Sequence, residues 1–236
     1  MSLAIVYTRA ALGIEAPLIT VEVHLSNGLP GLTMVGLPET TVKEARDRVR
    51  SALINSGYAF PAKKITINLA PADLPKEGGR YDLPIALALL VASEQLNTTR
   101  LNQYEFVGEL ALTGGLRGVP GAIPSAMEAI KAGRRIVVSS DNAAEVGLIG
   151  GSDCLVADHL QEVCAFLAGQ TSLSPPLAEA PARDERYEDL LDVIGQQQGK
   201  RALEIVAAGG HNLLLIGPPG TGKTMLASRL DRKSVV

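Results

Sequence analysis

The chain has 236 residues and carries 22 Lys and Arg against 25 Asp and Glu, which gives a formal net charge of −3. Apolar residues make up 46% of the chain and charged residues 20%, as in proteins that bury a core, so disorder throughout is excluded. The slightly acidic balance also excludes nucleic-acid binding through bulk positive charge and leaves open only a local basic patch.

The sequence carries no sign of secretion or membrane insertion. Its N-terminus, MSLAIVYTRAALGIEAP, lacks the basic segment and the long apolar run of a signal peptide. No stretch of about 18 uncharged apolar residues is present, so no transmembrane helix is expected. The two cysteines, Cys154 and Cys164, are too few for a disulfide framework and suit a reducing compartment. We therefore expect a soluble, cytoplasmic protein without a membrane partner.

Prolines and small residues divide the chain. Pro175, Pro176 and Pro181 lie in a segment, residues 170–186, that has no apolar periodicity. Proline removes backbone donors and favours extended conformations, so this segment is interpreted as a linker. The predicted divisions are a first domain (1–168), a linker (169–186), the start of a second domain (187–230) and a short tail (231–236).

The first domain alternates two kinds of apolar pattern. β-Branched and alternating segments predict strands over residues 18–25, 32–35, 64–69, 106–112 and 134–139. Helical periodicity predicts helices over residues 40–55, 82–95, 125–132, 141–146 and 159–167. This mixture in this order predicts an α/β fold of the mixed α+β kind.

One predicted helix carries a row of positive charges. Lys43, Arg46 and Arg50 lie at i, i+3 and i+7 in the helix 40–55, so they share one face. Such a face can contact nucleic-acid phosphates, but the neighbouring Glu44 and Asp47 favour an ordinary solvated surface helix. The neighbouring pair Lys63 and Lys64 leaves the same two interpretations open.

The motif with the clearest chemistry lies near the end of the chain. The letters GPPGTGKT match the phosphate-binding pattern GxxxxGK(S/T), and an apolar run, 212–216, predicts the strand that precedes such a loop. A helix is predicted from Met225 onward, which completes the strand–loop–helix context. The residues of the loop are Gly217, Pro218, Pro219, Gly220, Thr221, Gly222, Lys223 and Thr224.

The residue types of this loop predict ATP and Mg²⁺ as cofactors. Its glycines allow backbone N–H groups to turn toward phosphate oxygens. Lys223 is predicted to reach the β- and γ-phosphates, and Thr224 to place its hydroxyl on Mg²⁺.

The longer run DVIGQQQGKRALEIVAAGGHNLLLIGPPGTGKTMLA resembles the start of an AAA+ ATPase module. More narrowly, it resembles the magnesium-chelatase-like ComM (YifB) family. The resemblance implies that the turn formed by Val193, Ile194 and Gly195 lies beside the adenine. From the residues alone, a hydrophobic turn before the helix predicted at 199–208 explains the same letters.

Three segments of the first domain extend the resemblance: NGLPGLTMVGLPE, NLAPADLPKEGGRYDLP and VGELALTGG. The domain implied by the family is similar in fold to the Lon protease domain, so a serine–lysine hydrolase has to be considered. The nucleophile position of the Lon pattern holds Arg80, and its lysine position falls near Ile123. Because nucleophilic catalysis needs both groups, we expect no protease activity and assign no catalytic residue.

The family resemblance implies the function of a longer protein. Such proteins are expected to form rings and to use ATP hydrolysis to remodel DNA, by branch migration and recombination in natural transformation. A magnesium-chelatase-type motor that inserts metal is the alternative. A third interpretation makes this chain a binding or assembly module without catalysis.

The end of the chain differs from a complete motor. Only 12 residues follow Thr224, too few for a Walker B segment, sensor residues and an arginine finger. The tail DRKSVV departs from the family pattern, so we expect a truncated or frameshifted product that ends in a non-native tail. Without sheet neighbours for its predicted strand, the segment 187–236 is expected to be poorly ordered.

Overall fold

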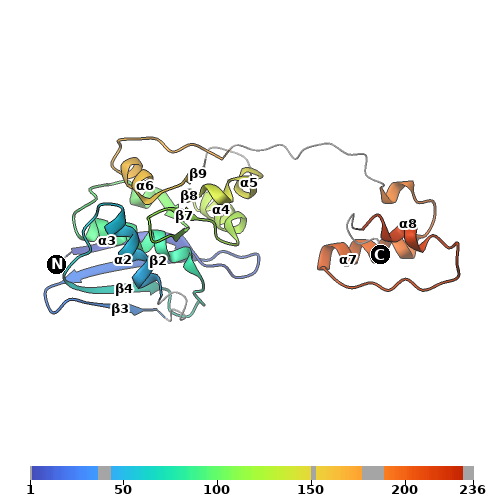
Figure 1. Ribbon diagram of the computed structural model, residues 1–236, viewed down its shortest axis with the longest axis horizontal. Coiled ribbons are helices and arrows are strands. Elements are labelled where there is room, and N and C mark those ends of the chain that lie inside the picture. Colours follow the sequence, from blue (N-terminus) through green and yellow to red (C-terminus); the bar gives the residue numbers. More distant parts are fainter. Residues whose placement is uncertain (1, 37–43, 150–152, 177–188, 231–236) are drawn as a thin grey trace. The chain divides into compact units, whose positions relative to one another are not determined.

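The computed structural model describes residues 2–36, 44–149, 153–176 and 189–230. The chain divides into two compact units, residues 1–179 and 180–236, which are treated separately below (Figure 1). Three predicted features lie outside the described residues: the start of the helix at 40–43, which includes Lys43, most of the linker, and the tail 231–236.

The first unit is built on a mixed sheet. Among its described residues the sheet has seven strands in the order β3-β4-β2-β1-β5-β8-β9. The pairs β1–β2 and β2–β4 are antiparallel, and the other four pairs are parallel. The strands are β1 (Ser2–Arg9), β2 (Leu18–Ser26), β3 (Gly31–Val35), β4 (Lys64–Ala70), β5 (Tyr104–Phe106), β8 (Arg135–Ser139) and β9 (Cys154–Ala157). A small hairpin pairs β6 (Glu109–Leu110) with β7 (Leu116–Arg117).

Helices pack against this sheet, which confirms the predicted α/β class. The described α-helices are α2 (Ala45–Asn55), α3 (Asp82–Ala92), α4 (Ala122–Lys131), α5 (Ala143–Gly147) and α6 (Leu160–Leu167). Successive side chains of a strand point to opposite faces. In β8, Ile136 and Val138 belong to the core cluster that includes α4 residues, whereas Val137 belongs to the cluster around α3. The sheet is therefore covered on both faces at this end.

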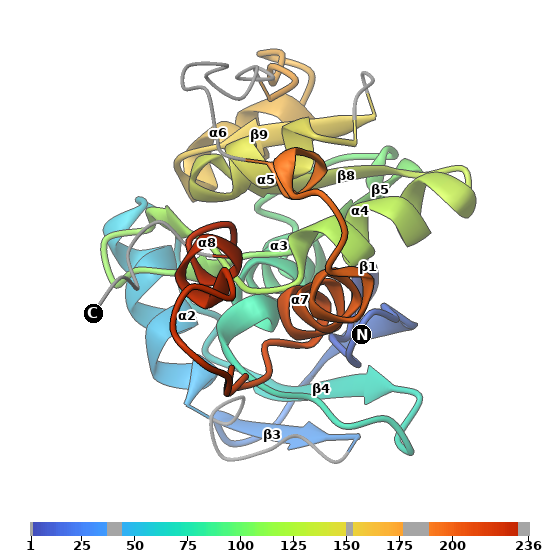
Figure 2. The same cartoon turned by 90° about the vertical axis from the view of Figure 1, so that its right-hand side faces the viewer.

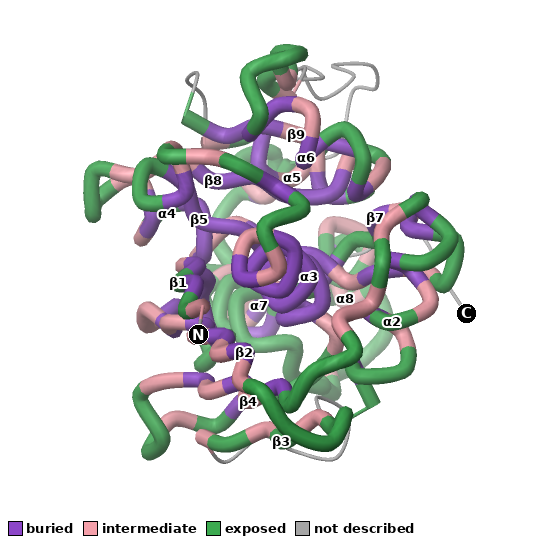
Figure 3. Tube along the Cα trace, turned by 90° about the vertical axis from the view of Figure 1, so that its left-hand side faces the viewer, coloured by how far each residue is buried: buried purple, intermediate pink, exposed green. Residues whose placement is uncertain are grey.

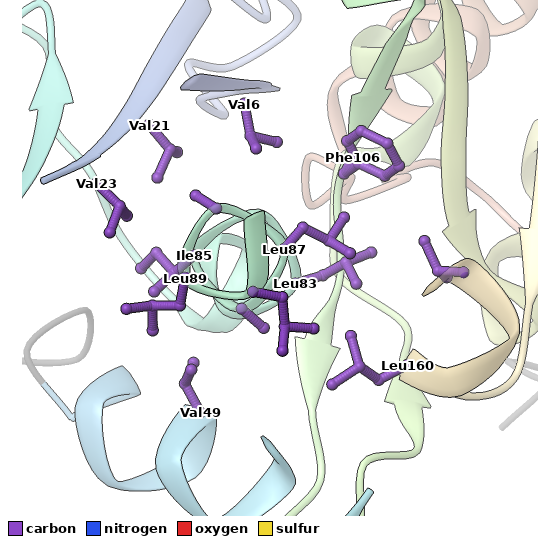
Figure 4. Packing of buried hydrophobic residues seen from close by; sticks show 14 of the residues in the cluster. Val6, Val21, Val23, Val49, Leu83, Ile85, Leu87, Leu89, Phe106 and Leu160 are labelled. Carbon is purple, nitrogen blue, oxygen red and sulfur yellow. The ribbon is translucent and has the colours of Figure 1, made fainter. Parts of the chain in front are cut away.

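The main core is centred on α3. This helix is apolar around its whole circumference, and all but one of its residues are buried (Figure 3). A helix with no polar face is stable only when other elements surround it. Figure 4 shows Val6 and Val21 of the sheet, Val49 of α2, Phe106 of β5 and Leu160 of α6 arranged around it.

Several predicted boundaries are corrected by backbone geometry. The predicted strand 106–112 is broken, because Gly108 leaves the sheet and its N–H donates to the Arg80 carbonyl. The predicted helix 82–95 ends at Ala92, and Glu94 has a φ of 61° that no helix accommodates. The helix predicted from residue 125 begins at Ala122, which places Pro124 in its first turn, where no donor is lost. The predicted helix 141–146 is a 3₁₀ turn, residues 140–142, followed by α5.

Three strands, β1, β7 and β9, were not predicted from the sequence. Of these, β1 and β9 pair with strands that are distant in the chain. β1 pairs with β2 over its whole length, with Val6 opposite Val21, and it also pairs with β5. β9 is short and pairs with β8. Because strand pairing is non-local, the residues of a short apolar segment do not indicate which strand it pairs with.

A buried ionic network joins three elements of the first unit. Glu105 of β5 is fully buried and accepts hydrogen bonds from Arg9 at 2.6 and 2.7 Å. Arg134 donates to the same carboxylate at 2.9 Å. Arg9 also donates to the carbonyls of Ala16 and Glu128, so one guanidinium joins β1, the chain before β2 and α4.

Replacing the carboxylate of this network tests its energetic role. Glu105→Gln is expected to lower the free energy of unfolding by about 3–5 kcal/mol, because it leaves the buried Arg9 guanidinium without its counter-charge. Chemical denaturation measures the change. Glu128→Gln is the control, because its partly exposed side chain forms its ion pair with Lys131 and not with Arg134, and it is expected to cost less than about 1 kcal/mol. Equal losses in both variants would contradict the assignment.

Candidate nucleotide-binding site

The second unit holds the candidate loop between two helices. Its described elements are a 3₁₀ turn (Leu190–Asp192), α7 (Gln197–Gly209) and α8 (Lys223–Ala227). Val193, Leu203 and Leu226 form a small buried cluster that joins them. The helices approach closely, since a methyl group added at Gly199 would lie 2.9 Å from a Leu226 methyl carbon. In Figure 2, the segment from α7 to α8 is seen as a long open loop.

The prediction of a strand over residues 212–216 is wrong. No strand is formed there, and the side chains of Leu214 and Ile216 are 80% and 86% exposed. A strand requires backbone partners on a neighbouring strand, and the described part of the second unit contains none. The apolar run 212–216 is therefore present, but it has no neighbouring strand with which to pair.

The loop 217–224 is closed by its own side chains. Gly220 and Gly222 have φ values of 82° and 81°, a left-handed conformation in which a side chain is strained. The Thr221 hydroxyl donates to the Pro218 carbonyl at 2.9 Å. The Lys223 ammonium donates to the carbonyls of Gly217 and Pro218 at 2.9 and 2.7 Å. Lys223 thus lies over the loop and near the groups that the motif assigns to phosphate binding.

The last positions of the motif lie at the start of α8. This helix begins at Lys223, two residues earlier than the helix predicted from Met225. Thr224 follows in its first turn and is exposed. Its hydroxyl is therefore open to a ligand held by the loop.

The predicted adenine-side turn lies beside this loop. Val193 is buried in the small cluster, whereas Ile194 is 97% exposed. Gly195 has a φ of 72°, and the following Gln196 donates through its side-chain amide to the Thr221 carbonyl at 3.3 Å. The structure thus brings together the two segments that the sequence analysis selected separately.

Two contacts of this arrangement were not found from the sequence. They are the bond from Gln196 to the loop and a bond of 2.9 Å from the Arg229 guanidinium to the Asp189 carbonyl. The partners are 25 and 40 residues apart, and neither pair belongs to a recognised spacing. A side chain that donates to a distant carbonyl leaves no local pattern.

In the first unit, Arg80, which occupies the Lon-like nucleophile position, and the nearby Lys76 stabilise the fold. Arg80 is buried and donates to the carbonyls of Arg9 and Pro120. Lys76 is also buried and donates to the carbonyls of Leu74 and Pro71, and burial lowers its pKa. These cations therefore fix the loop before α3 to the core.

Asp82, at the start of α3, forms an ion pair. Its carboxylate accepts bonds of 2.7 and 3.1 Å from Arg48 of α2 and one from the Leu110 N–H. Burial raises the pKa of Asp82 to about 6, and the bonds from Arg48 oppose this rise. The Asp82 carboxylate therefore links α2 to α3 through its ion pair with Arg48.

Among the described residues, no three His, Cys, Asp or Glu side chains gather where they could hold a metal ion. None of the described helices is both long and apolar enough to span a membrane.

Comparison with known families gives two matches along the chain. The family described as Subunit ChlI of Mg-chelatase matches residues 21–142. The family described as Magnesium chelatase, subunit ChlI, matches residues 189–233, which contain the loop 217–224.

Similar proteins come from several bacteria. YifB of Salmonella typhimurium is 77% identical and YifB of Escherichia coli 75% identical. The competence protein ComM of Haemophilus influenzae is 59% identical. Each alignment spans 98% of this chain and 46% of the relative, so the chain covers about half the length of these proteins.

The unpaired run 213–216 is expected to show little protection from hydrogen exchange. The described structure gives its N–H groups no hydrogen-bond acceptor, so they are expected to exchange at close to the unprotected rate. The amides of β2 that pair with β1 and β4 are the protected reference. Exchange of the chain in deuterated buffer, read by mass spectrometry or NMR, measures both. Strong protection of Leu213 to Ile216 would show that the run is paired as a strand.

Proposed function

We propose that this chain, which belongs to the magnesium-chelatase subunit ChlI family, binds ATP together with Mg²⁺ through the loop 217–224 of its second unit. The observation that carries the proposal is the position of Lys223, whose ammonium is held against the carbonyls of Gly217 and Pro218. A phosphate chain on the loop offers this ammonium stronger, charged acceptors than neutral carbonyls.

The other residues of the loop have complementary roles. Positive φ at Gly220 and Gly222 supports a curled backbone whose N–H groups can face phosphate oxygens. The exposed hydroxyl of Thr224 is the group that would coordinate Mg²⁺. Mg²⁺, when bound, neutralises phosphate charge and bridges the β- and γ-phosphates.

The turn that precedes α7 is proposed to lie against the adenine. Ile194 is the most exposed of its three residues and is free to pack on the base, while Val193 anchors the turn in the buried cluster. The bond from Gln196 to the Thr221 carbonyl holds this turn at the loop. In this proposal, the turn 193–195 contacts the base and the loop 217–224 contacts the phosphates, both within the second unit.

The relatives are about twice as long as this chain. For a protein of that length, we propose that a ring of subunits uses ATP to remodel DNA. The process would be branch migration and recombination in natural transformation. Support comes from the 59% identity to a protein named for competence. A cytoplasmic location fits this role. The second candidate is a motor for magnesium insertion, which is favoured by the names of both matching families.

Nucleotide binding is tested with a fluorescent ATP analogue and the 236-residue chain. Lys223→Ala is expected to weaken binding by about tenfold or more, which corresponds to about 1.4 kcal/mol, because the variant loses the cation that meets the phosphates. Lys200→Ala removes the same charge from α7 and is expected to leave the affinity unchanged. Fluorescence anisotropy measures the three proteins side by side. Equal affinities of the unsubstituted chain and Lys223→Ala, or no binding by the unsubstituted chain, would refute the proposal.

The two functions of the longer protein are separated by what stimulates ATP hydrolysis. A DNA-remodelling ring is expected to hydrolyse ATP severalfold faster when DNA is added, because work on DNA is coupled to turnover. A metal-insertion motor is expected to respond to a porphyrin with Mg²⁺ and not to DNA. A phosphate-release assay on a protein of the relatives' length, with each addition in turn, distinguishes the two. The corresponding Lys223→Ala variant is the blank.

A further inference from the structure

A recess with positive walls lies at one edge of the first unit. It has a cavity volume of about 260 Å³ and is formed by α2, the loop between α2 and β4, and the start of the edge strand β3. Among the described residues, its charged lining side chains are Arg46, Arg50 and Lys63, with no carboxylate. We call this recess the basic groove. The elements α2 and β3, which provide lining residues of the groove, are labelled in Figure 1.

The charges of the basic groove are not used by the fold. Arg50 and Lys63 have no ion-pair partner among the described residues, and both are exposed. Arg46 lies 3.7 Å from Asp47, but both side chains are largely exposed, so solvent weakens this pair. Arg46 and Arg50 stand at i and i+4 on α2, where like charges repel and destabilise a helix. In a chain of net charge −3, these exposed side chains form a local excess of positive charge with which an anion can pair.

The shape of the basic groove favours an extended anion. Four residues of α-helix rise about 6 Å, which is comparable to the separation of neighbouring phosphates on one nucleic-acid strand. Lys63 lies across the recess from α2, and its carbonyl accepts the Gly31 N–H at 3.4 Å, which ties this wall to β3. The recess is too small for a duplex and admits one sugar–phosphate chain.

The floor of the basic groove favours nucleic acid over an acidic peptide. The Arg50 guanidinium lies 4.9 Å from the centre of the Phe60 ring, and Phe60 itself lines the recess. A guanidinium held over an aromatic ring offers a planar cationic surface on which a base can stack. A carboxylate side chain can pair with the guanidinium charge but has no ring to stack on it.

We propose that the basic groove of the first unit binds a single strand of nucleic acid, with its cations on successive phosphates and a base against Arg50. This deepens the proposed role of the longer protein in DNA remodelling and rests on it. It places a DNA contact outside the nucleotide-binding unit, so it can be tested without ATP.

The test uses the 236-residue chain and a fluorescently labelled oligothymidylate in nucleotide-free buffer, from about 50 to about 200 mM salt. For a single strand, each phosphate contact adds about 0.7 to the steepness with which log K falls as log salt concentration rises. The double variant Arg50→Gln/Lys63→Gln removes two contacts and is expected to reduce the slope by about 1.4, with severalfold weaker binding at the lower salt concentration. Fluorescence anisotropy gives the affinities.

The matched control is Arg117→Gln/Lys131→Gln, which removes the same charge from exposed positions of the first unit outside the basic groove. It is expected to leave the slope unchanged. Equal losses in the two double variants would overturn the proposal, because they would show binding by net charge alone. Absence of binding by the unsubstituted chain at low salt would overturn it too.

Two further measurements separate this proposal from the proposed function. The groove variant is expected to keep its affinity for the ATP analogue, and Lys223→Ala is expected to keep its affinity for the oligonucleotide. Loss of oligonucleotide binding in Lys223→Ala alone would assign the strand to the second unit and refute the groove. Polyglutamate that competes as well as unlabelled DNA would refute the choice of nucleic acid. Circular dichroism of each variant confirms that the fold is retained.

Discussion

The first unit depends on the burial of one helix that has no polar face. α3 is apolar on every side, so it is stable only because sheet, α2 and α6 enclose it together. Its start is held by the pair of Asp82 with Arg48, which fixes α2 beside it. The ionic network of Glu105 with Arg9 and Arg134 then joins the sheet to the chain near α4. Arg80, at the Lon-like nucleophile position, and the nearby Lys76 are part of the same anchoring and donate to backbone carbonyls of the core.

The second unit differs from the first, because few of its described residues are buried. Val193, Leu203, Val206 and Leu226 are its buried residues among those described, and they are few for a stable core. The loop 217–224 nevertheless keeps a defined form through short-range bonds of Thr221 and Lys223 to its own carbonyls. Local geometry of this kind needs no large core, which explains why the motif retains its shape where the adjoining strand does not form.

The sequence predicts best what is encoded locally. The apolar stretch of α3, the alternating residues of β2 and the letters of the loop 217–224 each carry their own signal, and the first two appear close to the predicted places. Non-local pairing is where prediction from sequence fails. β1 was missed because its pairing with β2 and β5 is invisible in its own residues, and the run 212–216 was taken for a strand because apolar content alone indicates one. At the candidate site, the bond from Gln196 to Thr221 was missed for the same reason.

The unpaired run at 213–216 has a consequence for the behaviour of the chain at high concentration. This uncharged segment exposes Leu214 and Ile216, and its N–H groups have no acceptor in the described structure, so another chain segment can pair with it as a strand. Two copies that pair there satisfy each other's backbone groups and cover apolar surface. By mass action, the second unit then becomes more stable as the protein becomes more concentrated, whereas the first unit, whose strands are already paired within the sheet, does not. Dilution therefore acts on the two units of one chain in different ways.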